Sequence, residues 1–509
     1  MSIFNQVPVT RISRSTHNLS HQTKGTYDGG PIYPLMTELA FPGDTWKVSL
    51  ENFIRTMPMI APILDRVDVK IDSFFIPLRL IWDDFEDFIT LGPTGEFTAT
   101  RPTIRVGSYT PSQAGYVTRL NKVFGVGGSA DYLNFPTNNP YVLNTAHGVI
   151  QLDALPFRSY QLVYNEYFAN ESIDTPIPLE TSSGVLELNL NSTGTDLVDN
   201  FFLKYRGWRK DYFTSALPTP QKGPAVRIPF GDITIGASED PDTHKKDAFM
   251  LGSESQFTDT SDEIEALMHP QNRVGGGSRG NFVTDADANR NMYYEHGLKA
   301  TMDTQTLPTI EELRYAECLQ EYYETNARGG SRYKEHLLNI WHTKSKDARL
   351  DRPEYLGGYR GPITISDIDQ TSQSDISAQG TLAGKGLSAG GQKLFKYHVP
   401  EWGIIMVTMS IVPKSSYCQG YRRWNLYNDV FDWPNPFFAN LGEQEIFNKE
   451  LFDDPSDGLN DDTFGYTPRY AEAKFIPDSV HSQLKNTLAY WHLGRIFASR
   501  PNLNSAGST

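Results

Sequence analysis

Two glycine-containing stretches are the first candidates for phosphate or dinucleotide chemistry. Gly125-Val-Gly-Gly-Ser-Ala130 fits the loose G-x-G-x-x-A pattern of a dinucleotide-binding turn. Such a turn must open a helix, and Asp131-Tyr-Leu-Asn-Phe-Pro136 does not have that character. Gly380-Thr-Leu-Ala-Gly-Lys-Gly386 lacks the spacing of a phosphate-binding loop, and no Ser or Thr follows its lysine. The sequence therefore predicts a flexible loop at 125–130 and no phosphate cradle.

Carboxylates and histidines are the residues that could hold a metal or transfer protons. The acidic run at 453–462 could gather calcium ligands, but a proline interrupts it and the twelve-residue loop pattern is absent. His336 and His342 lie six residues apart, which does not place both on one helical face. Glu311 and Glu312 would lie at a helix N-terminus, where negative charge is favourable without catalysis. We predict a solvated turn at 453–462, no metal, no cofactor and no enzyme activity.

Length and composition indicate an ordered protein of strands and loops. A chain of 509 residues exceeds one ordinary core, so we expect two domains or one fold with long insertions. The 41 glycines and 32 prolines break it into short segments, which favours an all-β core. Cys318 and Cys418 form no C-x-x-C pair and predict reduced thiols. With neither a long apolar run nor a secretory signal, we expect no membrane insertion and a cytosolic site of synthesis.

The net charge of −15 bears on nucleic-acid binding. An acidic surface repels phosphates, so the whole-chain charge argues against a coat on DNA. The distribution of charge softens this objection, because residues 1–27 contain three Lys or Arg residues and no acid. Residues 232–305 contain fourteen acidic residues against six basic ones. We therefore expect a mildly basic N-terminal arm at 1–27 and an outward-facing insertion at 232–305.

Alternating apolar residues predict strands early and late in the chain. The patterns at 46–50 and 67–71 predict strands with one face in water. In the run at 402–412, the odd-numbered and the even-numbered residues are both mostly apolar. This pattern predicts a central strand that is buried on both faces. Further strand patterns occupy 185–190, 225–230, 394–399 and 470–476. Because the spans between these strands are too long for hairpins, the sheet must pair segments that are distant in sequence.

Helices are predicted in two passages between the strands. Thr309 and Glu312 have the spacing of a capping box, and apolar residues recur about once per turn after them. Gly329-Gly330 ends this helix and a second helix follows at 333–341, which gives a helical pair at 308–342. Another helix is predicted near 158–168, behind a proline in its first turn. We interpret these helices as insertions on a β core.

Two segments have the composition of irregular chain that must hold a fixed shape during assembly. Asp211-Tyr-Phe-Thr-Ser-Ala-Leu-Pro-Thr-Pro-Gln-Lys-Gly223 and Asp347-Ala-Arg-Leu-Asp-Arg-Pro-Glu-Tyr-Leu-Gly-Gly-Tyr-Arg360 combine prolines, glycines, aromatics and arginines. Both closely resemble the major capsid protein of the Microviridae, the small tailless phages with circular single-stranded DNA, and especially its gokushovirus branch. Further resembling blocks follow in the family's order, at 14–24, 39–46, 74–82, 154–167, 327–333 and 441–450.

The resemblance implies a fold and an assembly. The family's capsid proteins are mainly β, with an eight-stranded antiparallel jelly roll of the viral capsid type, long loop insertions and a few short helices. We accordingly expect a single jelly-roll capsid domain at 28–509 behind the interior arm at 1–27. Copies would self-assemble in the bacterial host cytoplasm into a T=1 icosahedral virion. The insertion at 232–305 would build a threefold surface protrusion for host attachment.

The resemblance also implies partners and candidate contact residues. The shell interior would meet the DNA genome through cations and aromatic faces, for which the candidates are Arg11, Arg14, Lys24, Arg422, Arg423 and Trp424. The two arginines of 422–423 could equally bridge to carboxylates of a neighbouring subunit. Host-receptor candidates on the insertion are Phe249, Met250, Phe282, Met292, Tyr293 and Tyr294, unless the insertion is only a solvent loop. The remaining implied partners are an internal scaffolding protein, a small basic DNA-packaging protein and a pilot protein.

A soluble β-sandwich carbohydrate-binding protein or glycoside hydrolase is the alternative hypothesis. Such folds carry both activities, and Trp433-Pro-Asn-Pro-Phe-Phe438 could form an aromatic platform for a sugar. No pair of carboxylates stands out as the acid and base of a hydrolase. Stoichiometry distinguishes the hypotheses, because a lectin would remain a small oligomer whereas a shell protein would form large closed particles.

Overall fold

The computed structural model of this chain describes most of its length. The described residues are 15–92, 95–96, 99–106, 114–137, 150–188, 197–227, 233–237, 298–302, 309–330, 332–369 and 382–503. The chain divides into two compact units. The first contains Met1–Lys222 together with Glu324–Thr509, and the second contains Gly223–Tyr323. The predicted insertion at 232–305 falls inside the second unit.

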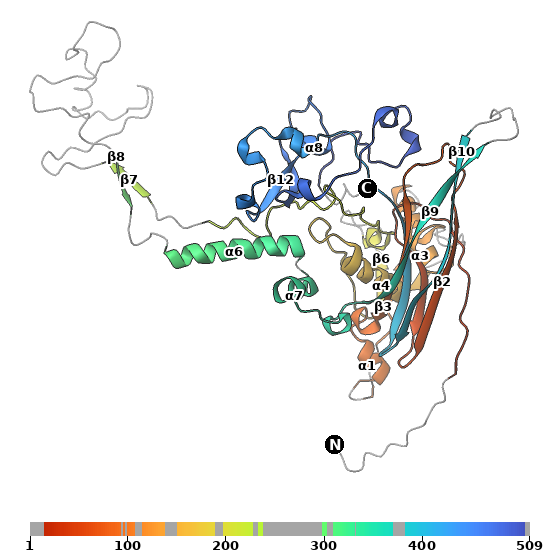
Figure 1. Cartoon of the computed structure of the whole chain (residues 1–509). Coiled ribbons are helices and arrows are strands. Elements are labelled where there is room, and N and C mark those ends of the chain that lie inside the picture. The colour runs from red at the N-terminus through yellow and green to blue at the C-terminus, as the bar shows by residue number, and fades with distance from the viewer. Residues whose placement is uncertain are drawn as a thin grey trace, which may run out of the picture. The chain divides into compact units, whose positions relative to one another are not determined.

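A curved six-stranded sheet organises the first unit (Figure 1). Its order is β1-β11-β3-β9-β10-β2, and every neighbouring pair is antiparallel. The strands are β1 (Tyr33–Ala40), β2 (Thr45–Arg55), β3 (Val67–Pro77), β9 (Glu354–Asp369), β10 (Leu382–His398) and β11 (Gly403–Pro413). As predicted, the sheet pairs segments far apart in sequence, such as β1 with β11 and β2 with β10. The fold is mainly β and agrees with a viral jelly roll, with six strands described in its main sheet.

Strand β11 is central because both of its faces are apolar. Ile404 and Met406 pack into one hydrophobic core, and Ile405 and Val407 pack into another on the opposite face of the sheet. Neighbouring β3 contributes to both cores in the same way. The prediction of a strand buried on both faces at 402–412 is thus confirmed, with β11 lying between β1 and β3.

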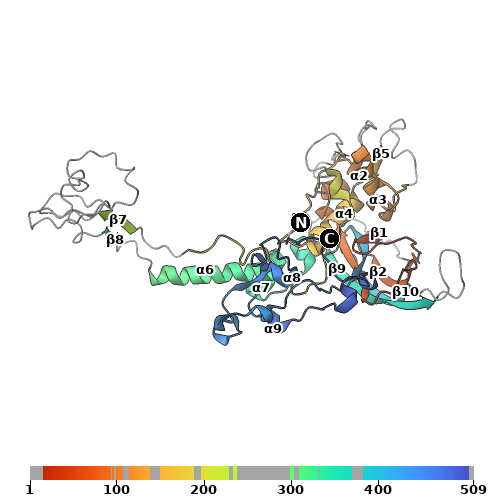
Figure 2. The same cartoon turned by 90° about the horizontal axis from the view of Figure 1, so that it is seen from above.

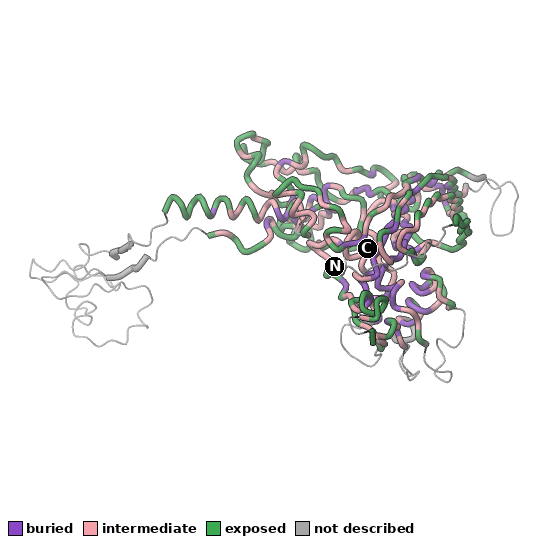
Figure 3. Tube along the Cα trace, turned by 90° about the horizontal axis from the view of Figure 1, so that it is seen from below, coloured by how far each residue is buried: buried purple, intermediate pink, exposed green. Residues whose placement is uncertain are grey.

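The two faces of the sheet are covered differently. On one face, β3 and β11 pack against the helical layer of α4 (Leu155–Val163) and its π-helical continuation Tyr164–Phe168. The other face of the sheet forms the second core. Its buried residues come from all the main strands except β2, which adds half-buried side chains such as Val48. Figure 3 marks the buried residues along the chain. The helix predicted near 158–168 is confirmed, and it begins slightly earlier than expected.

Smaller elements complete the first unit. The short strands are β4 (Thr103–Val106), β5 (Ile150–Asp153) and β6 (Val185–Leu188), which form one sheet, and β12 (Glu443–Phe447) and β13 (Thr463–Pro468), which form another. The helices are α1 (Phe85–Thr90), α2 (Ala114–Phe124), α3 (Ser129–Tyr132), α7 (Tyr333–Trp341), α8 (Asn448–Leu451) and α9 (Ala471–Lys474). Single 3-10 turns lie at Leu78–Leu80, Leu197–Phe201, Asp347–Leu350, Arg423–Leu426, Val430–Asp432, Pro436–Phe438, Ser482–Lys485 and Ala489–Trp491.

The second unit contains a strand pair and the start of a long helix. Strands β7 (Ile233–Ala237) and β8 (Leu298–Met302) are antiparallel partners. Helix α6 (Ile310–Gly329) begins in this unit, and Figure 2 shows its full length. The predicted capping box is present, since Thr309 N donates to Glu312 Oε2 at 2.7 Å and Glu312 N donates to Thr309 Oγ1 at 3.2 Å. Gly330 follows α6 with φ of 89°, and α7 has the predicted bounds.

Several predictions about secondary structure are wrong. Residues 471–474 form α9 instead of a strand. Ala, Glu and Lys have high helix propensity, and here it outweighs the alternation of apolar and polar residues. Residues 225–227 are not a strand, and 228–230 lie outside the described residues. The helix α3 opens within the glycine stretch at 125–130, although its four residues follow another helix and not a strand. The polar face predicted to lie in water at 67–71 is largely covered, with Asp68 only 6% exposed.

The second assembly segment is also more regular than predicted. Residues from Glu354 onward belong to β9, which pairs with β3 through a bulge opposite Ser73 and Phe74. Gly357 has φ of 140°, and a Cβ there would lie 2.8 Å from the carbonyl oxygen of Leu394. A glycine is therefore required for the strand to pass its neighbour. Within the described residues, no helix is both long and apolar enough to cross a membrane.

Candidate assembly surface and cationic face

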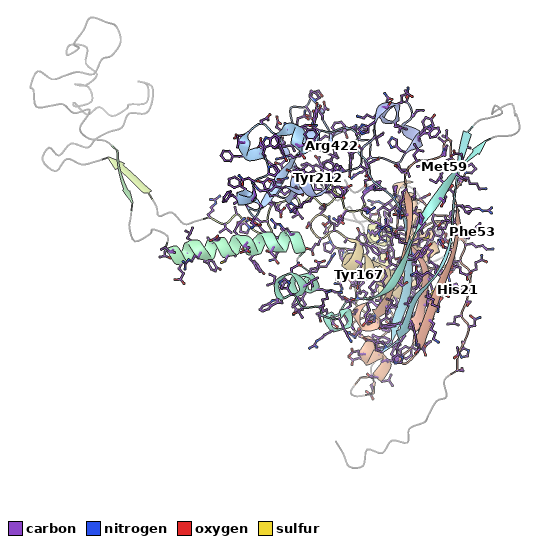
Figure 4. All side chains as sticks on the ribbon, in the orientation of Figure 1. His21, Phe53, Met59, Tyr167, Tyr212 and Arg422 are labelled. Carbon is purple, nitrogen blue, oxygen red and sulfur yellow. The ribbon has the colours of Figure 1, made fainter. Side chains whose placement is uncertain are left out.

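The first predicted assembly segment is fixed by contacts inside its own chain. Asp211 Oδ1 accepts hydrogen bonds from the backbone N–H groups of Phe213 and Thr214, at 3.0 and 2.8 Å. Its other oxygen accepts from the Tyr417 hydroxyl at 2.8 Å. Tyr212 and Phe213 are then buried in a third hydrophobic core (Figure 4). The fixed shape follows from an Asp-centred turn that holds two aromatics in that core.

The second segment is anchored by an arginine in the same manner. The Arg352 guanidinium carbon lies 4.6 Å from the centre of the Tyr167 ring. Its Nη2 donates to the carbonyl oxygen of Glu166 at 3.2 Å, and Nε lies 3.5 Å from Asp347 Oδ1. Because Arg352 is 8% exposed, its charge depends on these partners. Arg352, Tyr212 and Phe213 therefore dock within the subunit.

The two adjacent arginines at 422–423 have different environments. Arg423 Nη1 lies 2.7 Å from Glu450 Oε1 and donates to the carbonyl oxygen of Glu445 at 3.0 Å. The Glu450 side chain is 1% exposed and also accepts from the Tyr212 hydroxyl at 3.0 Å. Burial raises the pKa of Glu450, although the Arg423 charge opposes that rise. The carboxylate partner of Arg423 thus lies in its own chain.

Arg422 and Trp424 remain on the surface. Arg422 is exposed and has no ion pair within the described part of the chain, and Trp424 is 61% exposed (Figure 4). They begin a segment, 421–441, that exposes an unusual number of large apolar side chains. Its members and exposed fractions are Tyr421 48%, Trp424 61%, Val430 79%, Phe431 68%, Trp433 62%, Phe437 92% and Leu441 60%. We name these seven residues the aromatic loop.

The aromatic loop is held in shape by local capping. The Asp429 side chain accepts from the Val430 backbone at 2.6 Å, and the Asn435 side chain accepts from the Phe437 backbone at 3.0 Å. These contacts define two successive 3-10 turns at Val430–Asp432 and Pro436–Phe438. The aromatic side chains therefore project from fixed turns, which lowers the entropy lost when a partner covers them.

The N-terminal arm is described only in part. Arg11 and Arg14 lie outside the described residues, whereas Lys24 is exposed and has no ion pair in the part of the chain that is described. The arm joins the first unit at Tyr27, whose ring lies 5.1 Å from that of Tyr33 and 5.8 Å from that of Tyr132. Burial raises the pKa of Tyr33 to about 12. All six host-contact candidates on the insertion lie outside the described residues.

Sequence reasoning missed a group of cations on the polar face of β3. We name the cationic face by its members, Arg66, Lys70, Arg206 and Arg360, which surround Asp68 and Asp72. Arg66 Nε lies 2.8 Å from Asp68 Oδ1, and Arg360 also pairs with Asp68. Arg206 Nη1 lies 2.6 Å from Asp72 Oδ2. The signal was present in Arg66-Val-Asp-Val-Lys-Ile-Asp72, where every second residue is charged.

The acidic run at 453–462 closes around an arginine. Arg500 Nε and Nη2 contact the two carboxylate oxygens of Asp457 at 2.6 and 2.8 Å. Arg500 Nη2 also donates to Asn460 Oδ1 at 2.8 Å. These contacts hold the pKa of Asp457 below its usual range. A guanidinium occupies the centre of this loop, and the described residues contain no group of three or more His, Cys, Asp or Glu side chains that could hold a metal.

Comparisons with known proteins extend over nearly the whole chain. Residues 5–507 match the family model described as capsid protein (F protein). The capsid protein VP1 of Chlamydia phage 1 is 31% identical over 560 residues, covering 98% of this chain and 90% of that protein. VP1 of Bdellovibrio phage phiMH2K is also 31% identical, covering 98% and 89%. VP1 of Spiroplasma virus 4 is 26% identical, covering 99% and 88%.

Proposed function

Because the chain belongs to the phage capsid protein (F protein) family, we propose that its copies close into a small T=1 icosahedral shell around circular single-stranded DNA. The family makes the chain a structural protein of the virion, and the predicted resemblance to Microviridae capsid proteins is confirmed. The T=1 geometry and the enclosed genome are the proposed parts of this function. They rest on the family resemblance and on the exposed surfaces of the subunit.

The aromatic loop is the observation that carries this proposal. Soluble monomers rarely expose contiguous apolar patches larger than a few hundred Å², whereas this loop exposes seven large apolar side chains within 21 residues. Phe437 is 92% exposed, so almost none of its ring is covered by its own chain. Aromatic side chains held on fixed turns are typical of the energetic centres of protein interfaces. We assign the aromatic loop to a contact between copies.

Helix α6 supports the same interpretation. Its apolar positions Ile310 and Leu313, expected from the periodic pattern to face a core, are 72% and 47% exposed in the single chain. Tyr315 in the next turn is 69% exposed. An amphipathic helix gains most of its stability by burying its apolar stripe. In a closed shell, neighbouring subunits would cover this stripe, and each of several interfaces can be modest because symmetry multiplies them.

Electron microscopy after size-exclusion chromatography tests the shell. The chain is expressed with its scaffolding partner, and uniform closed particles are the expected result. In parallel, Phe437→Ser should leave a folded subunit but reduce particle yield at least tenfold, because a central interface aromatic is worth about 2 kcal/mol or more per contact. Leu459→Ser is the matched control, since Leu459 is 46% exposed outside the aromatic loop. Small oligomers of the wild-type chain in the presence of scaffold would contradict the proposal.

The remaining partners follow from the same proposal. An internal scaffolding protein, a small basic DNA-packaging protein and a pilot protein would accompany the subunit during assembly in the bacterial cytoplasm. The low basicity of the chain supports a separate packaging protein, because the chain as a whole carries a net charge of −15. The insertion at 232–305 would form a protrusion that meets a host-cell receptor. Its excess of acidic residues supports an outward position, away from the DNA.

A further inference from the structure

The cationic face contains an ammonium group that lacks an acceptor. Lys70 on β3 has Arg360 of β9 and Ser410 of β11 as its cross-strand neighbours. Within the described residues, the Lys70 side chain makes no hydrogen bond and no ion pair, yet it is half-buried. Burial lowers its pKa, and the nearby charges of Arg206 and Arg360 lower it further, although Asp72 and Asp68 partly oppose that shift. An unpaired, partly desolvated cation among other cations is a site that an anion would stabilise.

The carboxylates of this face are already occupied by arginines. Asp68 is shared by Arg66 and Arg360, and Asp72 is bound by Arg206, which also donates to Ser410 Oγ at 3.0 Å. Four cations therefore surround two carboxylates, which leaves an excess of two positive charges. This excess matters because the chain as a whole is strongly acidic. The cationic face is thus a local exception to the charge of the molecule.

Two arginines of this face are open to solvent, although its carboxylates are largely covered. The Arg66 and Arg360 side chains are 58% and 44% exposed, so both can exchange water for a ligand's oxygens. Arginines at such positions keep donors beyond those used by a single carboxylate oxygen, because a guanidinium has five N–H groups. Buried arginines such as Arg352, in contrast, are enclosed by their partners.

Aromatic residues adjoin one of these cations in sequence. Arg206 belongs to Lys204-Tyr-Arg-Gly-Trp-Arg-Lys210, which contains four cations and two aromatics in seven residues. Tyr205, next to Arg206, is 56% exposed, and its backbone pairs with Pro31 at the start of β1. Cations that contact phosphates beside an aromatic face that can stack on a base are the chemistry of single-strand binding. An acidic peptide would need the cations but not the exposed ring.

We propose that the cationic face binds the phosphate backbone of single-stranded DNA, with Lys70 and Arg360 on one phosphate and Tyr205 stacked on a neighbouring base. This inference rests on the proposed function, because the enclosed genome supplies the strand. It names residues other than those predicted from the sequence, and it places the DNA contact on the sheet itself. Binding would be independent of base sequence, since phosphate and ring contacts carry little sequence information.

Salt-dependent binding of a fluorescent oligothymidine of about 15 nucleotides to purified subunits tests the proposal. The logarithm of the affinity falls as the logarithm of the salt concentration rises. Loss of one phosphate contact reduces the magnitude of that slope by about 0.7 for a single strand. Lys70→Met should therefore make the slope shallower by about 0.7. Between 1 M and 0.1 M salt, the affinity of the wild-type chain should then rise about fivefold more than that of K70M. Lys70→Arg should restore both values. Lys47→Met is the control, because Lys47 is an exposed cation on β2, and it should leave the slope unchanged.

The outcomes for Lys70→Met decide whether the inference stands. An unchanged slope in folded K70M would overturn the inference. If K70M binds DNA normally but forms no particles, the anion is a carboxylate of another copy, which also overturns it. Should K70M not fold, Arg66→Met replaces it, because the Arg66 side chain is 58% exposed, and the same loss of slope is expected. Failure of wild-type particles to form would contradict the capsid proposal alone, since oligonucleotide binding is read on subunits.

Discussion

Asp68 is a buried carboxylate on β3 that pairs with two arginines. Its burial alone would raise the pKa, but hydrogen bonds and charges from Arg360 and Arg66 outweigh burial and hold the pKa below its usual value. A carboxyl group that is more acidic when folded stabilises the folded state above its unfolded pKa, about 3.9. That stability is lost as the pH falls through the lower, folded pKa, because the unfolded chain then binds more protons.

Asp68→Asn should therefore destabilise the subunit at neutral pH and flatten its response to acid. We expect a loss of about 2 kcal/mol at pH 7, the usual value of hydrogen bonds to a charged group, and a difference from wild type that shrinks as the pH falls below about 4. Urea unfolding of purified subunits across this range measures both. Asp367→Asn on the neighbouring strand β9 is the control, as Asp367 is exposed and unpaired within the described residues. Equal pH slopes for wild type and D68N would refute the assignment.

At the scale of single residues, the type of a residue and its spacing in the sequence do not show what surrounds it in the folded chain. Arg422 and Arg423 are adjacent and identical, yet one is exposed and the other is paired with a carboxylate that is 1% exposed. That difference depends on Glu450, which is 27 residues from Arg423 in sequence. The cationic face is similar, because Arg206 and Arg360 come to β3 from 134 and 292 residues away from their aspartates. Such pairings depend on tertiary structure and leave no local trace.

At the scale of elements, prediction succeeds where one local signal is long and unopposed. Strand β2 alternates exposed and half-buried residues along all of its 11 residues, as its pattern indicated, and α7 has the predicted bounds. Prediction fails at α9, where helix propensity overrides a short alternation. It fails again at Tyr355–Arg360, where glycines and a proline suggested loop but in fact allow a bulged strand to pass its neighbour.

Helix α6 offers a test at this scale. Thr309 and Glu312 satisfy each other's backbone N–H groups, so Thr309→Ala should remove one cap and cost the first turn about 1 kcal/mol. Hydrogen exchange of the amides in that turn should accelerate about fivefold, while the amides of α7 keep their protection. Glu311→Gln is the control, because Glu311 lies in the same turn and makes no cap bond among the described contacts. Unchanged exchange in T309A would show that the cap does not hold the turn.

At the scale of the whole molecule, the chain divides into two units, and the described hydrophobic cores belong to the first of them. Among the described residues, all three hydrophobic cores draw their members from outside 223–323. The described strands of the main sheet likewise belong to the first unit, while β7 and β8 form a separate described pair. A shell subunit built this way can vary its second unit without disturbing the core that folds it. This organisation was visible in the sequence only as the excess of acidic residues at 232–305.

Replacement of residues 240–296 by Gly-Ser-Gly-Ser tests that separation. Because Ala237 pairs with Leu298 in the β7–β8 register, the two ends of the excised segment are adjacent and a short link can close them. The first unit should keep its unfolding free energy within about 0.5 kcal/mol, since the change removes no core residue. Particles should form under the conditions used for the wild-type chain, and their attachment to host cells should fall at least tenfold.

The control for this replacement inserts the same link without removing the segment, after residue 297. Attachment of that variant should match the wild-type level if the segment itself makes the host contact. Loss of particles in the excised variant, with the inserted variant intact, would instead make 240–296 an interface between copies. Retained attachment in the excised variant would move the receptor contact to the first unit.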